Sequence, residues 1–297
     1  MPTLSQTFNT TCVQKRGPKP PEYDAYANVL QAEYQEFLSR DPSEKELQRF
    51  LEQHPSLVPG AWTPGTKSGH EPLHYALITQ PRLAGLRTRR PDFMWIATHS
   101  GTWFPTLIEI ESPGKKIFTK SRIPSSDFTK ARNQLAQWRA WFNSPSNIQL
   151  FIDFYHIPSK LRYHRTMQIH MILIYGRRDE FEADPELSKH RASLLPGADE
   201  ELMSYDRLSP DPDLRDAITV RLNSAGRYNV VALPPVFSMT PVLADRLLDI
   251  DGFDKALDKA KRISIERKKF LRERLLYWKA WAASAGTTKV FTNYFRE

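Results

Sequence analysis

The sequence predicts an α/β fold in which a mixed central sheet is flanked by helices. The first observation is the order of hydrophobic patterns, namely a helix, three strands, a further helix and then more strands, which is typical of α/β proteins. The second is the composition. Of the 297 residues, 40% are hydrophobic and 26% are charged, as in an ordinary globular protein.

Two helices are expected near the start of the chain. The pattern becomes helical from Tyr26, and a second helix is predicted from Ser43 to about Gln53. Ser43 is a suitable N-cap, and Glu46 stands at the capping-box position three residues later. A longer helix is predicted from about Ser126 to Phe142, because apolar residues recur there at helical spacing.

Apolar, β-branched runs predict the strands of the sheet. Residues 98–102 separate two of these runs and give a hairpin signal. The expected strands are His74–Thr79, Arg90–Ala97, Trp103–Glu111, Gln149–Tyr155, Gln168–Tyr175 and Tyr228–Leu233.

Changes in composition divide the chain into three parts. Residues 1–21 are polar and are expected to form a flexible tail. Residues 22–180 contain most of the predicted elements and are expected to form the α/β domain. Residues 181–297 begin polar and loop-rich, and they are expected to form a mostly helical accessory region ending in a basic helix from about Ile263 to Ala283. That helix either contacts DNA or another subunit, or presents a solvated basic face.

The overall charge and the motifs that are missing limit the function. The net charge of +8 and the pI of about 9.5 favour polyanionic partners, although a basic surface that only aids solubility remains open. Cys12 alone builds no disulfide framework, and no secretory signal or bilayer-spanning run occurs, so we expect a cytoplasmic protein without a membrane partner. The sequence contains no phosphate-binding P-loop, so no nucleotide cofactor is expected, and no histidine pattern of zinc hydrolases.

The predicted hairpin brings two carboxylates together. If the turn is centred on Ser100 and Gly101, cross-strand partners have numbers that sum to 201, and Asp92 lies opposite Glu109. Two carboxylates this close repel each other unless a cation lies between them, and hard oxygen ligands suit Mg²⁺ or Mn²⁺. The backbone carbonyl of Ile110 is a candidate for a further ligand. The alternative is that these acids belong to a solvated strand face.

Further charged residues follow the same strand. Glu111 shares a face with Glu109, because side chains alternate along a strand. Lys115, Lys116 and Lys120 come after the Pro-Gly turn and are within reach of the same region. Carboxylates and lysines in one place are suited to the hydrolysis of phosphodiesters.

Four short segments occur in a characteristic order: Glu46–Pro55, Arg90–Phe93, Ile108–Pro113 and the pattern Ala131-x-x-Gln134-Leu135-x-x-Trp138. Together they resemble the Shedu-type anti-phage defence nucleases of the PD-(D/E)xK superfamily, which the mismatch endonuclease NucS also resembles in its catalytic half. The likeness covers roughly Ser43 to Tyr155. It implies a restriction-endonuclease-like core, DNA as the substrate and assembly as a homo-oligomer.

The resemblance also implies roles for single residues. Asp92 and Glu109 correspond to the metal-binding acids, Glu46 to a helix glutamate that adds to the metal shell, and Gln134 to a glutamine near the scissile phosphate. Position 111 departs from the pattern, because it holds glutamate where the superfamily usually has lysine. Either Lys116 or Lys120 replaces that lysine, or Glu111 itself binds metal.

The sequence therefore predicts a Mg²⁺- or Mn²⁺-dependent DNA endonuclease of the Shedu type. Its expected site residues are Asp92, Glu109, Glu111, Gln134, Lys116 and Glu46. Two alternatives stay open, namely a catalytically degenerate DNA-binding or sensor protein and a NucS-like DNA repair endonuclease. Glu46 and Gln134 also have structural explanations, as a capping-box residue and as a residue that borders the core.

Overall fold

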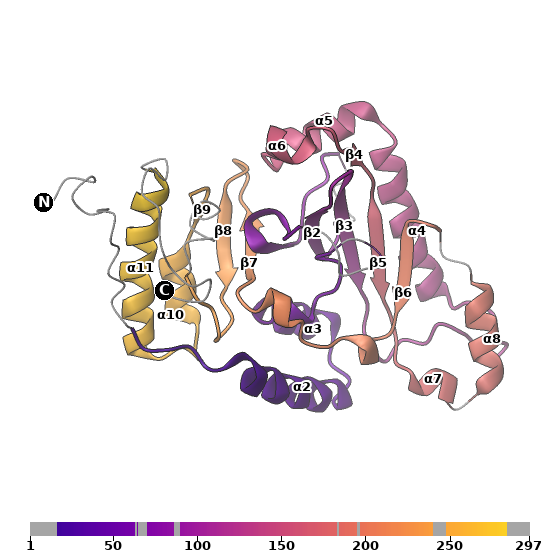
Figure 1. Cartoon of the computed structure of the whole chain (residues 1–297). Coiled ribbons are helices and arrows are strands. Elements are labelled where there is room, and N and C mark those ends of the chain that lie inside the picture. The colour runs from indigo at the N-terminus through magenta and orange to yellow at the C-terminus, as the bar shows by residue number, and fades with distance from the viewer. Residues whose placement is uncertain are drawn as a thin grey trace, which may run out of the picture.

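A single mixed sheet of nine strands runs through the molecule in the order β6-β5-β3-β2-β1-β7-β8-β9, with β4 beside β3 (Figure 1). The computed structural model describes residues 17–62, 64, 70–85, 90–182, 184–194, 197–239 and 248–283. The strands are β1 (Ala76–Thr79), β2 (Phe93–Thr98), β3 (Thr102–Ile110), β4 (Thr166–Met167), β5 (His170–Ile174), β6 (Glu200–Met203), β7 (Ile218–Leu222), β8 (Tyr228–Ala232) and β9 (Ile250–Asp251).

Helices flank this sheet, as expected for the predicted α/β class (Figure 1). Helix α4 packs on β5, α10 packs on β8, and α11 packs on α10. The helices are α2 (Tyr23–Ser39), α3 (Glu44–Gln53), α4 (Ser126–Phe142), α5 (Pro145–Phe154), α6 (Ser159–Arg162), α7 (Asp179–Glu182), α8 (Pro185–Ser193), α10 (Phe253–Lys259) and α11 (Ile265–Ala283). Short 3₁₀ turns complete the described elements: η1 (Pro55–Leu57), η2 (Leu73–Tyr75), η3 (Tyr205–Arg207) and η4 (Pro212–Leu214).

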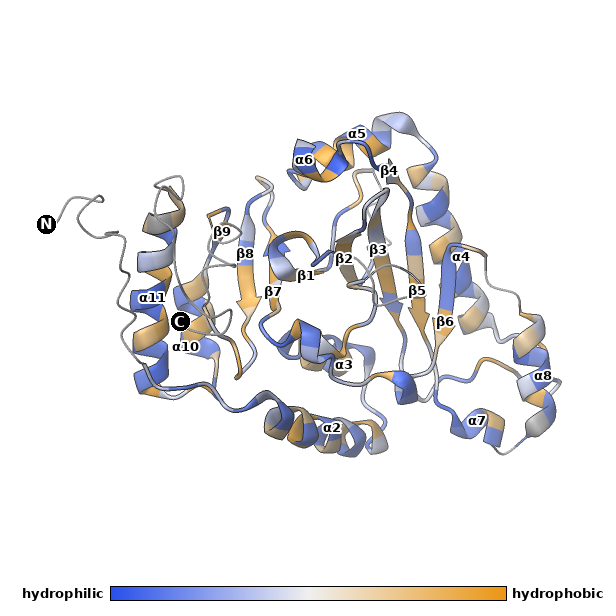
Figure 2. Cartoon of the chain, viewed as in Figure 1, coloured by the Kyte–Doolittle hydropathy of each residue, from blue (hydrophilic) through white to orange (hydrophobic). Residues whose placement is uncertain are grey.

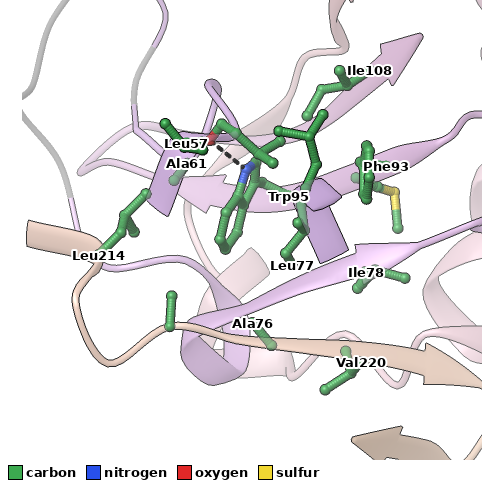
Figure 3. Packing of buried hydrophobic residues seen from close by; sticks show 14 of the residues in the cluster. Leu57, Ala61, Ala76, Leu77, Ile78, Phe93, Trp95, Ile108, Leu214 and Val220 are labelled. Atoms are coloured by element: carbon green, nitrogen blue, oxygen red, sulfur yellow. Dashed lines mark hydrogen bonds between the residues drawn. The ribbon is translucent and has the colours of Figure 1, made fainter. Parts of the chain in front are cut away.

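The centre of the sheet is buried on both faces. Every residue of β2 and of β3 is buried, which explains why these strands are nearly continuous apolar runs (Figure 2). Trp95 on β2 lies among apolar side chains that include Leu57 and Leu77, and its indole N–H donates to the carbonyl of Val58 at 3.3 Å (Figure 3). The buried indole thus keeps a hydrogen-bond partner, so its burial leaves no polar group unsatisfied.

The predicted hairpin register is confirmed. Strands β2 and β3 are antiparallel, and Phe93 pairs with Ile108, so partner numbers sum to 201 as expected. The turn closes through a hydrogen bond of 2.9 Å from the His99 amide to the Thr102 carbonyl. This register places Asp92, directly before β2, against the end of β3 that carries Glu109.

The predicted strand over Gln149–Tyr155 is wrong, because residues 149–154 belong to helix α5 and Tyr155 is its C-cap. Pro145 occupies the first turn, where its missing N–H costs nothing. Phe151 is buried and packs on Phe142 and Trp103, and the partly buried Ile148 and Ile152 lie on the same helical face. A short apolar run has both interpretations, and the proline before it is the feature that favours a helix.

The other predicted elements near the site mostly agree with the structure. The helices over Ser43–Gln53 and Ser126–Phe142 and the basic C-terminal helix are confirmed within a few residues. The first expected strand is shorter than predicted. His74 and Tyr75 have φ values of 57° and 51° within a 3₁₀ turn, so β1 starts only at Ala76.

The region after residue 181 was expected to be mostly helical, but it also supplies four strands of the sheet. Strand β6 pairs with β5, and β7 pairs in parallel with β1. Both sides of the predicted boundary at residue 180 therefore contribute to one sheet, and the division into two domains stays a prediction. Residues 1–16 of the predicted tail lie outside the described residues. Within the described residues, no helix has the length and apolar character needed to cross a bilayer.

Candidate active site

Asp92 and Glu109 form a carboxylate pair at the carboxyl end of β3. The two carboxyl groups are close enough for each to shift the pKa of the other, and Oδ2 of Asp92 accepts the backbone N–H of Ile110 at 2.9 Å. Glu109 is buried, with 8% of its surface exposed. The sequence-derived pairing of these two acids is therefore present in the folded chain, and we call it the acid pair.

Burial makes both carboxylates of the acid pair weak acids. It raises the pKa of Asp92 to about 7, against the lowering effect of the Ile110 N–H. Burial is also the main cause that raises the pKa of Glu109 well above its usual value, followed by repulsion from Asp92. Two such groups share a proton or require a cation to remain charged at neutral pH.

Helix α4 brings Gln134 to the acid pair. Its amide Nε2 donates to Oε1 of Glu109 at 2.6 Å. The helix starts at the N-cap Ser125, whose hydroxyl accepts the amide of Phe128 at 3.2 Å, and its apolar face is buried. Gln134 is the partly buried neighbour of the buried Leu135, so it borders the core and also contacts the site.

Glu111 extends the acidic region beyond the acid pair. Its negative charge contributes to the raised pKa of both Asp92 and Glu109. Its backbone amide donates to the carbonyl of Ile174 at 3.1 Å, and its carboxylate forms an ion pair with Lys115. Lys115 is thus a lysine in direct contact with the residue at position 111.

The two lysines expected to replace that residue lie elsewhere. Lys116 forms an ion pair with Asp179 on α7, with 3.1 Å between Nζ and Oδ1, and both side chains are exposed. Lys120 is exposed and forms no ion pair within the described part of the chain. Neither lysine contacts the acid pair.

The structure places Glu46 away from the acid pair. Its carboxylate accepts the amide and the hydroxyl of Ser43, at 2.9 and 2.6 Å, in the capping box of α3. Glu44, two residues earlier, is close enough to the acids for its charge to raise the pKa of both Asp92 and Glu109. Burial and the charge of Glu111 in turn raise the pKa of Glu44 itself.

Gln48 is a second residue that the sequence analysis did not identify. It is buried, and its Nε2 donates to Thr79 Oγ1 at 2.8 Å and to the Asp92 carbonyl at 3.3 Å. The backbone amide of Gln80 donates to the same carbonyl at 2.7 Å. Gln48 follows Glu44 by four residues, so helical periodicity alone puts both on one face of α3. A polar residue on the apolar face of this helix was the signal in the sequence that could have identified Gln48.

The chemistry of the acid pair suits a cation. Oε2 of Glu109 is buried and has no hydrogen-bond partner within the described residues. Also within those residues, no group of three or more His, Cys, Asp or Glu side chains is arranged to hold a metal ion. An ion at the acid pair would therefore complete its shell with backbone carbonyls, water or substrate oxygens, as Mg²⁺ commonly does.

The basic residues of α11 mostly contact their own chain. Arg272 pairs with Asp254 and Asp258 of α10, Lys279 donates to the Ile250 carbonyl at 2.9 Å, and the buried Arg267 donates to the Phe237 carbonyl at 2.8 Å. These contacts hold the helix against α10 and the adjoining segments. They account for much of the basic pattern without a nucleic-acid partner.

The fold and the site together define an α/β protein with a carboxylate pair, the partly buried Asp92 and the buried Glu109, at one end of a central hairpin. The family model described as Shedu protein SduA, C-terminal, matches residues 41–209, which is more than half of the chain. The chain belongs to the Shedu family, and this membership suggests a role in anti-phage defence. The matched region contains the acid pair and all of its described partners. Neither the curated proteins nor the solved structures gave a match to the chain.

Proposed function

We propose that this protein is a metal-dependent DNA endonuclease of the Shedu type, built on a PD-(D/E)xK core, that hydrolyses phosphodiester bonds of phage or plasmid DNA. The observation that carries the proposal is the acid pair, in which Asp92 is partly buried and Glu109 is buried, with one carboxylate oxygen of Glu109 lacking a hydrogen-bond partner in the described structure. A buried, mutually repelling pair has little structural value of its own, because burying charge destabilises a fold.

Asp92 and Glu109 are the residues that would hold Mg²⁺ or Mn²⁺. The ion would activate a water molecule and stabilise negative charge on the scissile phosphate. Gln134, through its contact with Oε1 of Glu109, orients that carboxylate and presents an amide beside the phosphate. Glu44 adds negative charge on the α3 side of the site, where Glu46 does not reach.

Glu111 and Lys115 take the place of the usual lysine in this proposal. The ammonium of Lys115 neutralises Glu111 and lies beside the acidic region, so it can stabilise charge that develops on the phosphate. Lys116 is engaged with Asp179 and is not assigned a catalytic role. Assembly as a homo-oligomer is part of the same proposal and rests on family membership.

The decisive experiment is cleavage of supercoiled plasmid DNA by purified protein with Mg²⁺ or Mn²⁺. We expect the wild type to nick or linearise the plasmid only with the metal, and Asp92→Asn and Glu109→Gln to lose this activity. Glu186→Gln on α8, which removes an exposed carboxylate that pairs with Lys189 and not with the acid pair, is the matched control. Equal activity of wild type and Asp92→Asn would exclude the nuclease.

One observation favours a second candidate, a catalytically silent DNA-binding or sensor protein. Position 111 holds glutamate, and this carboxylate pairs with the nearest lysine, Lys115. A silent protein would bind DNA without metal-dependent cleavage. If cleavage is found, a comparison of mismatched, nicked and intact duplexes distinguishes defence against intact DNA from NucS-like repair.

A further inference from the structure

The loop between β3 and α4 is strongly basic. Residues 115–124, which we call the basic loop, contain Lys115, Lys116, Lys120 and Arg122 and no acidic residue. The loop joins the strand that carries Glu109 to the helix that carries Gln134. The ion pair between Lys115 and Glu111 ties its first residue to the acidic region. The basic loop therefore starts beside the candidate active site.

A buried carboxylate fixes the base of the basic loop. Glu180 on α7 is 7% exposed, and its two oxygens accept the backbone amides of Ile117 and Phe118 at 3.0 and 2.9 Å. Neither of these amides is bonded within the loop, so Glu180 supplies their partners. Since a buried carboxylate is costly unless it is hydrogen-bonded, this arrangement stabilises one conformation of the loop.

The tip of the basic loop is also ordered by its own backbone. The amide of Thr119 donates to the carbonyl of Ile123, and the amide of Arg122 donates back to the carbonyl of Thr119, both at 2.9 Å. Arg122 has a φ of 59°, which an L-residue adopts only when its surroundings require it. Lys120 and Arg122 are thus presented from a defined turn.

The charges of the loop remain accessible. Lys116 pairs with Asp179, and Arg122 pairs with Asp184 at 3.0 Å, but all four of these side chains are partly or largely exposed. Exposed ion pairs contribute only about 0–1 kcal/mol each, so a phosphate group can replace the carboxylate. Lys120 is exposed and needs no such exchange.

We propose that the basic loop contacts the phosphate backbone of duplex DNA beside the acid pair, and that Glu180 is the positioning residue that holds the loop for this contact. The inference rests on the proposed function, because it takes DNA as the ligand. An acidic site repels the DNA polyanion. The fixed basic side chains of the loop beside the site offset that repulsion and set the position of the DNA backbone.

The test measures DNA binding without cleavage. Fluorescence anisotropy of a labelled duplex is recorded with the Asp92→Asn parent, without divalent metal, between 50 and 200 mM NaCl. We expect Lys120→Gln with Arg122→Gln to weaken binding and to reduce the slope of log K against log salt by about 1.8, at about 0.9 per lost phosphate contact. Lys160→Gln on α6, which removes a single exposed charge outside the basic loop, is expected to leave affinity and slope close to the parent.

Glu180→Gln tests the positioning role. An amide can accept one of the two loop amides but presents a donor to the other, so we expect weaker DNA binding although every basic side chain is present. Adding Glu180→Gln to the Lys120→Gln, Arg122→Gln variant is expected to cause little further loss, because both changes act through the same contacts. A purely structural Glu180 would instead lower the melting temperature and weaken binding additively.

The outcomes separate this inference from the proposed function. If the parent binds DNA and the loop variants bind with unchanged affinity and salt dependence, the inference is overturned and the nuclease proposal is unaffected. If the loop variants lose binding but wild type never cleaves DNA, the inference stands and the nuclease proposal fails. If the parent binds no DNA, the inference is overturned, and cleavage of plasmid DNA by wild type with Mg²⁺ or Mn²⁺ alone decides the nuclease proposal.

Discussion

Gln134 donates a hydrogen bond of 2.6 Å to Glu109, and this contact links the middle of helix α4 to the acid pair at the end of β3. The other oxygen of the same carboxylate has no partner within the described residues. Gln134 thus orients Oε1 of Glu109, whereas Oε2 is buried and has, among the described residues, no partner that a ligand would have to displace.

Replacing Gln134 by alanine is expected to reduce cleavage while the protein stays folded. The variant loses one hydrogen bond to a charged group, which corresponds to roughly 10- to 100-fold in the single-turnover rate constant. Gln149→Ala removes an exposed amide that bonds Asp153 on α5 and serves as the control. An unchanged rate constant for Gln134→Ala would leave the glutamine with only its packing role.

The acid pair is expected to make stability depend on pH when no divalent metal is present. The pKa values of both carboxylates are raised in the folded state, so folding favours their protonated forms. The two states bind protons equally below about pH 4, and stability falls as the pH rises from there through neutrality, where the native state must bury charge.

Asp92→Asn removes one of these charges and is therefore expected to stabilise the metal-free protein. At pH 8 we expect a gain on the order of 2 kcal/mol over wild type, which shrinks toward pH 5. Chemical denaturation at both pH values measures it. Adding Mg²⁺ should then stabilise wild type and not the variant, since only wild type retains both carboxylates. A variant less stable than wild type at pH 8 contradicts this explanation.

Glu44 and Glu46 are expected to differ in their importance for cleavage. Glu44→Gln removes a charge that acts on both members of the acid pair. We therefore expect half-maximal cleavage to require a higher Mg²⁺ concentration and the reaction to be slower by roughly tenfold. Glu46→Gln keeps a capping-box residue at a position remote from the pair and is expected to leave cleavage unchanged. A larger loss of cleavage in Glu46→Gln than in Glu44→Gln would instead support Glu46 as the metal-binding glutamate.

The two neighbouring lysines are expected to separate chemistry from binding. Lys115→Gln leaves Glu111 without its partner beside the acidic region, so we expect kcat to fall by roughly tenfold or more. Lys116→Gln breaks only an exposed pair with Asp179 and is expected to change KM at most. Steady-state cleavage at varied DNA concentration measures both constants. Equal losses of kcat in the two variants contradict the assignment of Lys115.

The sequence predicted the part of the site that depends on local geometry. A hairpin with a recognisable turn has one register, so the pairing of Asp92 with Glu109 followed from counting residues. The contact between Gln134 and Glu109 needed the placement of α4 on β5, which no local pattern determines; the family resemblance implied only that Gln134 lies near the scissile phosphate.

The remaining differences have physical causes in particular residues. Glu46 satisfied the capping-box pattern and the family motif together, whereas Glu44 carried no local signal, because its closeness to the acids depends on how α3 meets the sheet. Strand β7 was not predicted, because its pairing with β1 joins residues about 140 positions apart. Such long-range pairing leaves little trace in the local sequence.

The pairing of β7 with β1 bears on how much of the chain is needed for function. Strand β7 begins at Ile218, beyond the residues that match the family, yet it covers the side of β1 that faces away from β2. A fragment that stops at residue 209 would expose a row of unpaired amides and carbonyls along the buried strand Ala76–Thr79, and such an edge invites aggregation. The segment after the family match thus supplies the strand that pairs with β1, next to Asp92. Variants of the candidate catalytic residues should therefore be made in the intact chain.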